Sequence, residues 1–318
     1  MNETRYIDGL AAAGKLPERE LHLAVGMFDG VHLGHRAVLE AAVLSARRTG
    51  GVAAALTFDP HPSRLLRPDK AVALIQPVAT KVNRMLLAGL DAVIMQKFTR
   101  EFAAIPAEDF VANLQRALPR LTTIYVGENW RFGRGRVGDV SLLNETAQNL
   151  GLSVFSAPRV SLDDKPISST RIRSALLEGD IEQVNRLLGY AYRSQNKVVD
   201  GRKLGRTMGF PTLNLQWAPE CQPKLGVYAV EVRVAGESRV WLGVANYGVR
   251  PTVEASEESA PTLEVHLFET PSFTTGADLQ VDWVAFLRSE KKFTNIETLR
   301  DQITMDRGGA KQWFERKR

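Results

Sequence analysis

Short apolar runs alternate with amphipathic helical patterns from about residue 22 to residue 160, and this alternation constrains the fold most. The runs have the length and composition of buried strands, and the segments between them repeat apolar residues about every 3.6 positions. Strands joined by crossover helices predict a parallel sheet with helices on both faces. The expected strands are His22–Val25, Val52–Phe58, Ala92–Met95, Thr123–Val126 and Val154–Ser156, and the expected helices are Gly34–Arg48, Pro77–Leu87, Pro106–Leu118 and Val140–Leu150.

The second half of the sequence changes its pattern. Strand-like runs follow one another from about residue 194 to residue 288 without a long helical segment, which predicts a β-barrel or compact sheet domain. A length of 318 residues suits two domains, which we place at residues 1–186 and 187–318. The expected strands are Lys197–Val199, Gly226–Val234, Val240–Ala245, Thr262–Leu267 and Gln280–Leu287, and the expected helices are Ser169–Leu177, Ile181–Leu188 and Ile296–Phe314.

Composition narrows the class of protein. With 44% hydrophobic and 24% charged residues, and neither a membrane-length apolar run nor a secretory signal, we expect a soluble protein without a membrane partner. The single cysteine, Cys221, cannot form an intrachain disulfide, which fits the reducing cytoplasm. The net charge of +5 favours anionic ligands, but the basic residues are scattered, so we expect no nucleic acid. We expect a monomer or weak homo-oligomer.

Residues 26–35, GMFDGVHLGH, connect the first expected strand to the first expected helix. A helix start offers unpaired N–H groups and the positive end of the helix dipole, so it suits a phosphate. Three glycines let a phosphate chain approach the backbone closely. His32 and His35 can hydrogen-bond phosphate oxygens there. The spacing alone also fits a zinc pair or residues that cap the helix, but carboxylate ligands are not clustered beside it.

Three further segments follow expected strands or open a helix. Ligands of parallel sheets bind at the carboxyl ends of the strands, so residues 58–62 (FDPHP) and 127–133 (GENWRFG) should share an edge with the histidines. Residues 167–173 (ISSTRIR) bring hydroxyls and two guanidiniums to a helix start, where Arg171 or Arg173 can clamp a phosphate. Together these segments indicate a nucleotide site.

A second candidate site lies in residues 201–214, GRKLGRTMGFPTLN. The glycines and basic residues make a loop whose N–H groups can surround phosphates, although a basic hairpin without a ligand has the same composition. Thr212 and Asn214 are two apart and face the same side of an extended segment, where two neutral oxygen ligands suit Mg²⁺. Glu264, on the polar face of the alternating run Thr262–Phe268, can take a proton from an alcohol if it faces that site.

These segments occur in an order and spacing that resemble those of bacterial bifunctional riboflavin kinase/FAD synthetases. The resemblance extends to GVYA, GVANYGVRPT and FLRSEKKF in the second half. It implies an α/β, Rossmann-like nucleotidylyltransferase domain with a parallel sheet, followed by a riboflavin-kinase-like β-barrel with a terminal helix. It also implies ATP-dependent phosphorylation of riboflavin to FMN, then AMP transfer from ATP to FMN, giving FAD and pyrophosphate. Mg²⁺ is the implied cofactor, and riboflavin, FMN and ATP are the small-molecule partners.

The same resemblance implies roles for individual residues. Met27 stands where asparagine is common in the family, Asp59 where glutamate is common, and Tyr247 and Val249 also depart from the expected residues. The implied catalytic residues are His32, His35, Arg171 and Glu264, and the implied metal ligands are Thr212 and Asn214. The residues implied to bind ATP or its phosphates are Gly26, Phe28, Asp29, Gly30, Gly34, Asn129, Ser169, Thr170, Gly205, Arg206 and Gly209. The residues implied to bind the flavin are Asp59, His61, Pro62 and Phe132.

Two alternatives stay open at the level of the sequence. An adenylyltransferase for another phosphorylated metabolite would explain the histidines and ISSTR, but not Thr212, Asn214 and Glu264. A flavin- or RNA-binding regulator without catalysis would explain the positive charge, but not the intact candidate catalytic residues.

Overall fold

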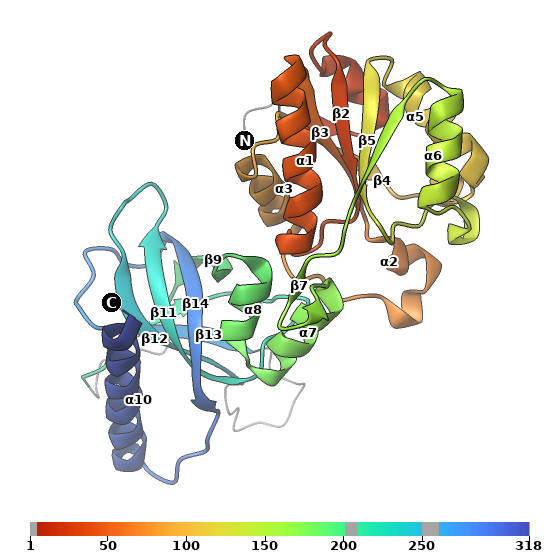
Figure 1. Ribbon diagram of the computed structural model, residues 1–318. Helices are drawn as coiled ribbons and strands as arrows, with labels where there is room; N and C mark the ends of the chain where they lie inside the picture. Colours follow the sequence, from red (N-terminus) through yellow and green to blue (C-terminus); the bar gives the residue numbers. More distant parts are fainter. Residues whose placement is uncertain (1–4, 201–208, 250–260, 318) are drawn as a thin grey trace. The chain divides into compact units, whose positions relative to one another are not determined.

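The computed structural model describes residues 5–200, 209–249 and 261–317. The chain divides into two compact units, Met1–Ser169 and Thr170–Arg318 (Figure 1). The boundary that we predicted for the functional domains, between residues 186 and 187, falls within a short helix of the second unit, α8 (Ile181–Leu188), and it stays a prediction.

The first unit contains a six-stranded sheet in the order β1-β4-β3-β2-β5-β6, and all neighbouring strands are parallel. All five residues of β2 are buried, as expected for a strand covered on both faces. The chain runs outward from β2 through β3 to β4 and returns to the other side of β2 with β5, so the strand order reverses beside β2. The strands are β1 (Tyr6–Asp8), β2 (Leu21–Val25), β3 (Val52–Asp59), β4 (Ala92–Lys97), β5 (Leu121–Gly127) and β6 (Ser153–Ala157).

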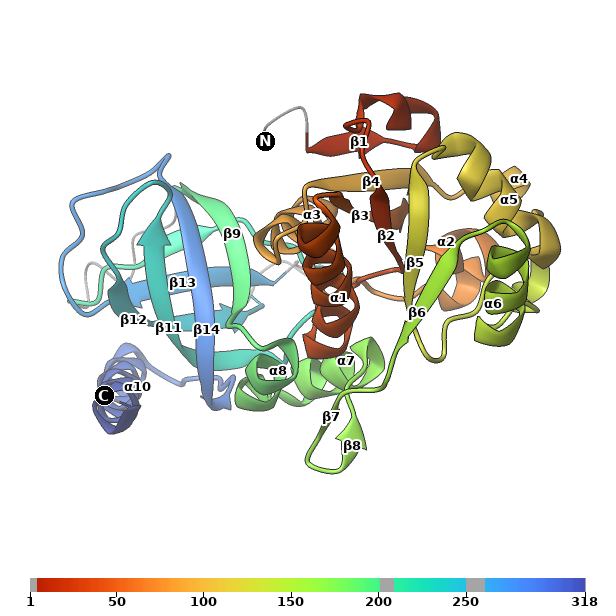
Figure 2. The same ribbon diagram turned by 45° about the horizontal axis from the view of Figure 1, so that its top comes forward.

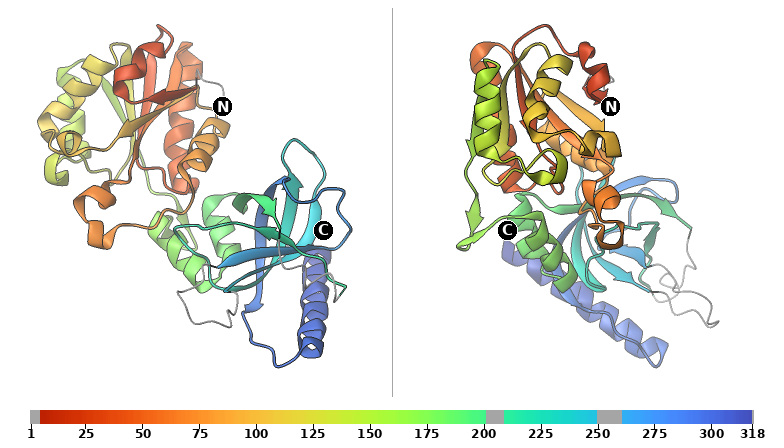
Figure 3. Two further views of the ribbon diagram at one scale, coloured as in Figure 1. Left: turned by 180° about the vertical axis from the view of Figure 1, so that it is seen from behind. Right: turned by 90° about the vertical axis from the view of Figure 1, so that its right-hand side faces the viewer.

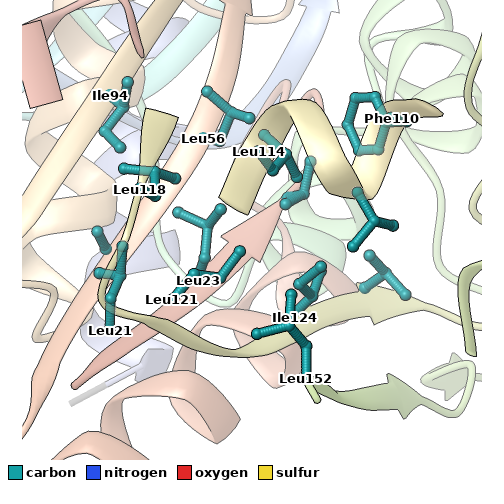
Figure 4. Packing of buried hydrophobic residues seen from close by; sticks show 14 of the residues in the cluster. Leu21, Leu23, Leu56, Ile94, Phe110, Leu114, Leu118, Leu121, Ile124 and Leu152 are labelled. Carbon is teal, nitrogen blue, oxygen red and sulfur yellow. The ribbon is translucent and has the colours of Figure 1, made fainter. Parts of the chain in front are cut away.

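Helices cover both faces of this sheet. Helices α1 (Leu33–Thr49) and α3 (Val78–Leu87) lie on one face, and α5 (Ala107–Ala117) and α6 (Val140–Asn149) lie on the other (Figures 1 and 3). Figure 4 shows Phe110 and Leu114 of α5 in the same cluster as leucines and isoleucines of the strands. The smaller elements are η1 (Leu10–Lys15), α2 (Pro62–Leu66), η2 (Pro68–Lys70), α4 (Arg100–Ala103), η3 (Arg134–Arg136), β7 (Ser161–Leu162) and β8 (Lys165–Pro166).

The second unit is built on a closed antiparallel barrel in the order β10-β13-β12-β11-β14-β9. Aromatic rings fill its interior: Trp283 lies with its ring centre 4.5 Å from that of Tyr228 and 5.0 Å from that of Trp217. The strands are β9 (Tyr192–Val199), β10 (Leu213–Leu215), β11 (Gly226–Val234), β12 (Trp241–Gly248), β13 (Thr262–Leu267) and β14 (Asp278–Ser289).

Among the described residues of this unit, the barrel is accompanied by the helices α7 (Ser169–Glu178), α8 (Ile181–Leu188) and α10 (Ile296–Lys317). Helix α10 lies along the outside of the barrel (Figure 2). Arg288 of β14 donates two hydrogen bonds to the nearly buried carboxylate of Asp306, at 2.8 and 2.7 Å. This ion pair and the apolar face around Phe314 fix α10 to the strands. Within the described ranges, every helix is too short or too polar to cross a bilayer.

Candidate active sites

The loop that follows β2 has a tightly constrained backbone. Phe28, Gly30 and Val31 all have positive φ angles, of 52°, 82° and 36°. Such a conformation is unfavourable for a β-branched residue such as Val31 and persists only where surrounding contacts hold it. The Asp29 carboxylate accepts a hydrogen bond from the Ile75 N–H at 3.1 Å, and the Ser169 hydroxyl donates to the Asp29 carbonyl at 2.9 Å. The loop is therefore fixed before a ligand binds.

His32 is the N-cap of α1. Its Nδ1 accepts a hydrogen bond from the backbone N–H of His35 at 3.2 Å, so in the neutral ring the proton lies on Nε2. The two imidazoles are stacked, with ring centres 3.6 Å apart and planes 15° apart. Burial, reinforced by His32 and Lys81, holds the pKa of His35 well below its usual value. His35 is therefore neutral at pH 7, and the helix capping that the sequence left open occurs at His32.

A cavity of about 220 Å³ opens at the start of α1, at the edge where β2 and β5 end. This is the edge at which the strand order reverses, the usual ligand site of such sheets. A Cβ atom on Gly34 would lie 3.3 Å from the His32 ring, so the glycine lets the imidazole lie against the helix. The cavity brings together six predicted residues, namely Gly26, Phe28, His32, Gly34, His35 and Asn129.

The predicted flavin residues fall in two places. Asp59 and His61 line a second, small cavity of about 10 Å³ beside the loop after β2. His61 caps α2, in which Pro62 is the first residue, through a hydrogen bond of 3.1 Å from the Ser63 N–H to its Nδ1. Phe132 is buried in the core below α5 and stacks on Trp130 at 4.6 Å, and only Trp130 reaches the large cavity. The flavin-binding roles of these residues stay predictions.

The ISSTR segment crosses from one unit to the other. Ser169 belongs to the first unit and is joined to Asp29. Thr170 and Arg171 lie in the first turn of α7 and belong to the second unit. The predicted roles of these residues in nucleotide binding and catalysis stay predictions.

The second candidate site forms on the barrel. Asn214 of β10 is paired in register with Glu264 of β13, which is in turn paired with Asn246 of β12. Directly paired residues point to the same face of a sheet, with Cβ atoms roughly 4.5–5.5 Å apart. A row of amide, carboxylate and amide groups therefore crosses three strands, with Thr212 one residue before β10. Gly209 lies just upstream with a φ angle of 83°, whereas the predicted Gly205 and Arg206 lie outside the described residues.

Tyr247 lies on the opposite face of the barrel wall from Glu264. It is paired with Leu263 and is fully buried among the core rings of Trp217 and Trp283. Burial raises the pKa of its hydroxyl to about 12. This departure from the family pattern therefore alters the barrel core rather than the row that contains Glu264.

The donor set of the second site fits a hard divalent cation. Thr212 and Asn214 offer neutral oxygens, which suit a magnesium ion that keeps water and phosphate ligands. In the described parts of the chain, no group of three or more histidine, cysteine or acidic residues is placed to hold a metal. This arrangement fits a metal that arrives with a nucleotide better than a metal held by the protein alone.

Sequence reasoning missed two polar residues beside these sites. Lys81 is buried and lines the small cavity. The sequence did not indicate this, because a lysine on an amphipathic helix is ordinarily exposed. Asn246 is paired with Glu264, and the alternation in GVANYG could have placed it on the polar face.

Two histidines at the start of a helix in a doubly wound sheet, followed by a barrel with a metal-type donor set, define a two-domain enzyme of ATP-dependent group transfer. Residues 15–171 match the family model for FAD synthetase, and residues 188–314 match that for riboflavin kinase. The chain belongs to the family of bifunctional riboflavin kinase/FMN adenylyltransferases. Enzymes of both families use ATP, typically with a divalent metal.

Two relatives carry the name of this family, and one solved structure shares the fold. A bifunctional riboflavin kinase/FMN adenylyltransferase of Escherichia coli K12 is 35% identical over 310 residues, which cover 98% of each chain. One of Listeria monocytogenes is 36% identical over 294 residues, which cover 92% of each chain. A solved structure from Streptococcus pneumoniae, described as a macrolide-efflux protein, has a TM-score of 0.85 at 27% identity and covers 97% of this chain and 98% of its own. The predicted fold class and family are confirmed, and the alternatives are not favoured.

Acid should destabilise the first unit, because two of its histidines are held neutral. Burial lowers the pKa values of His22 and His35 in the folded chain. When the pH falls below about 6.5, the ordinary histidine pKa, these two residues take up protons in the unfolded chain before they do so in the folded chain. Proton uptake therefore favours the unfolded state. We expect the melting temperature to fall by several degrees between pH 7.5 and pH 5.5 in calorimetry. A His22→Gln variant should lose part of this dependence; a melting temperature that is unchanged or higher at pH 5.5 would contradict the prediction.

Proposed function

We propose that this chain makes FMN from riboflavin on the barrel and FAD from FMN at the large cavity, with ATP as the donor in both steps. The observation that carries the proposal is the cavity at the edge of the sheet, because it gathers six of the predicted nucleotide-binding and catalytic residues from two separate segments, residues 26–35 and 127–133. On the barrel, the pairing of Asn214 with Glu264 supports the kinase step, because it brings a predicted metal ligand and the predicted base together from distant segments.

In the adenylyl transfer, a phosphate oxygen of FMN attacks the α-phosphorus of ATP. A new P–O bond forms, the bond from the α-phosphorus to the bridging oxygen breaks, and pyrophosphate leaves. The FMN phosphate is already a nucleophile, so positioning and electrostatic stabilisation supply most of the rate. His32 donates from Nε2 to phosphate oxygens, and the start of α1 adds backbone N–H groups beside it.

In the kinase reaction, the 5′-hydroxyl of riboflavin attacks the γ-phosphorus of ATP and ADP leaves. Glu264 accepts the proton of this hydroxyl. Thr212 and Asn214 would hold a divalent metal, which we propose to be Mg²⁺ and which would neutralise part of the phosphate charge.

The remaining proposals concern the setting of these reactions. The single cysteine, Cys221, is buried and cannot form an intrachain disulfide, which supports a role in the reducing cytoplasm. Riboflavin, FMN and ATP would be the partners. The two activities would separate between residues 186 and 187, and the protein would act as a monomer or weak homo-oligomer.

The test is to incubate the protein with riboflavin and Mg-ATP and to separate the flavins by chromatography. FMN should appear first and FAD later, and FMN supplied in place of riboflavin should give FAD with pyrophosphate. Excess EDTA should stop both reactions because it removes the divalent metal. The proposal would be wrong if neither FMN nor FAD formed.

A further inference from the structure

Lys81 of α3 is a buried cation that the proposed reaction does not use. It is the one lysine or arginine among the described residues that is buried, with 6% of its surface exposed. Taking an ammonium group out of water is unfavourable unless its hydrogen bonds are replaced. The hydrogen-bond partners of Lys81 therefore indicate what the charge is doing there.

The ammonium group joins the loop after β2 to the end of β3. Its Nζ donates to the Phe58 carbonyl at 3.3 Å, to the Met27 carbonyl at 3.4 Å and to the Thr57 hydroxyl at 3.1 Å. The Thr57 hydroxyl in turn donates to the Met27 carbonyl at 3.0 Å. Met27 lies in the loop that leads from β2 to His32, and Phe58 is the next-to-last residue of β3, where the FDPHP segment begins. One side chain of α3 thus fixes this loop relative to the end of β3.

The position of these bonds matters because the first loop is strained. Met27 directly precedes Phe28, whose φ angle is 52°, and this backbone conformation orients the segment that ends in the N-cap His32. The FDPHP segment carries Asp59, the last residue of β3, and His61, and both line the same small cavity as Lys81. In a reaction that relies on positioning, a small displacement between nucleotide and acceptor loops lowers the rate strongly.

We infer that Lys81 is a positioning residue of the adenylyl transfer: it fixes the nucleotide-binding loop after β2 against the end of β3, where the FDPHP segment with the proposed flavin residues begins. This inference rests on the proposed function of the first unit. It assigns Lys81 no contact with substrate, and it predicts that removing the ammonium group impairs FAD formation while leaving FMN formation unchanged.

The charges around Lys81 make the inference testable by pH. Burial lowers the pKa of Lys81 to about 8, although the nearby carboxylates of Asp29 and Asp59 favour its charged form. His61 also lines the cavity, and the charge of Lys81 contributes to the lowered pKa of His35. Lys81 is therefore charged below pH 8 and loses its proton as the pH rises through that value. Its hold on the two carbonyls should weaken over the same range, whereas an arginine would stay charged.

The experiment compares Lys81→Met and Lys81→Arg with Lys70→Met, a matched change at an exposed lysine of η2. FAD formation from FMN and FMN formation from riboflavin are measured separately on each full-length variant. For Lys81→Met we expect kcat of FAD formation to fall by about 10- to 100-fold, with FMN formation and the Lys70→Met variant unchanged. The wild-type rate of FAD formation should decline above pH 8, and Lys81→Arg should move this decline to higher pH.

Three results would overturn the inference. The first is full FAD formation by Lys81→Met; the second is a pH decline that Lys81→Arg leaves in place; the third is an equal loss of both activities in a folded variant. If Lys81→Met does not fold, the Thr57→Val variant tests the inference instead, because it removes one hydrogen-bond acceptor of the ammonium group. This variant should lower FAD formation and leave FMN formation unchanged, and full FAD formation would overturn the inference. A wild-type protein that makes no FAD would instead contradict the proposed function itself.

Discussion

Replacing Glu264 with alanine is expected to lower kcat for FMN formation by about 10²- to 10⁴-fold, the usual contribution of a general base. Glu264 is paired with Asn214 and Asn246 on neighbouring strands, so its carboxylate lies in a row of polar groups beside the proposed metal ligands. The FAD-forming activity should be unchanged, since no residue of the first unit is altered. Rates of FMN and FAD formation, each from its own flavin substrate, measure the two effects.

A second variant separates proton transfer from packing. Glu264→Gln keeps the size of the side chain and its place in the row but cannot accept the proton, so it should be nearly as slow as Glu264→Ala. Glu237→Ala, in the exposed turn between β11 and β12, serves as a matched control and should behave like the wild type. If Glu264→Gln retained more than about a tenth of the wild-type kcat, Glu264 would not be the general base.

Much of the fold could be predicted because hydrophobic periodicity was strong. The bounds predicted for β11, β13 and α8 agree with the structure, and β2 differs by one residue. The strand β1, Tyr6–Asp8, has only three residues and no flanking pattern, so its pairing with β4 is a tertiary result that the sequence does not reveal. Strand β9 extends five residues further toward the N-terminus than predicted, because polar residues in YRSQNKVV obscure the alternation.

The sites were predictable only as far as local spacing reaches. The sequence places Thr212 and Asn214 on one side of an extended segment, but the register that sets Asn214 opposite Glu264 joins segments far apart in the chain. Lys81 could not be found this way, because its burial depends on carbonyls that two other elements supply. The histidines lie between these cases: their spacing indicated both a phosphate site and a helix cap, and only the structure shows that His32 does the capping.

Replacing His32 with alanine is therefore expected to have two separable effects. Loss of a side chain that stabilises charge in the transition state should lower kcat for FAD formation by about 10²- to 10³-fold. Loss of the N-cap should cost about 1 kcal/mol of stability, because the His35 N–H would lose its acceptor. FMN formation should be unchanged. Steady-state rates and calorimetric melting temperatures report the two effects independently.

His32→Asn is the matched variant that distinguishes them. Asparagine is among the best N-cap residues, so it should restore most of the stability. Its shorter side chain has no donor at the position of the imidazole Nε2–H. We expect the melting temperature to recover toward the wild-type value while FAD formation stays about 10²-fold slow. If the activity recovered together with the stability, the imidazole would serve α1 alone. The rate would then arise from the backbone N–H groups at the start of α1 and from His35, whose neutral ring lies 3.6 Å from that of His32.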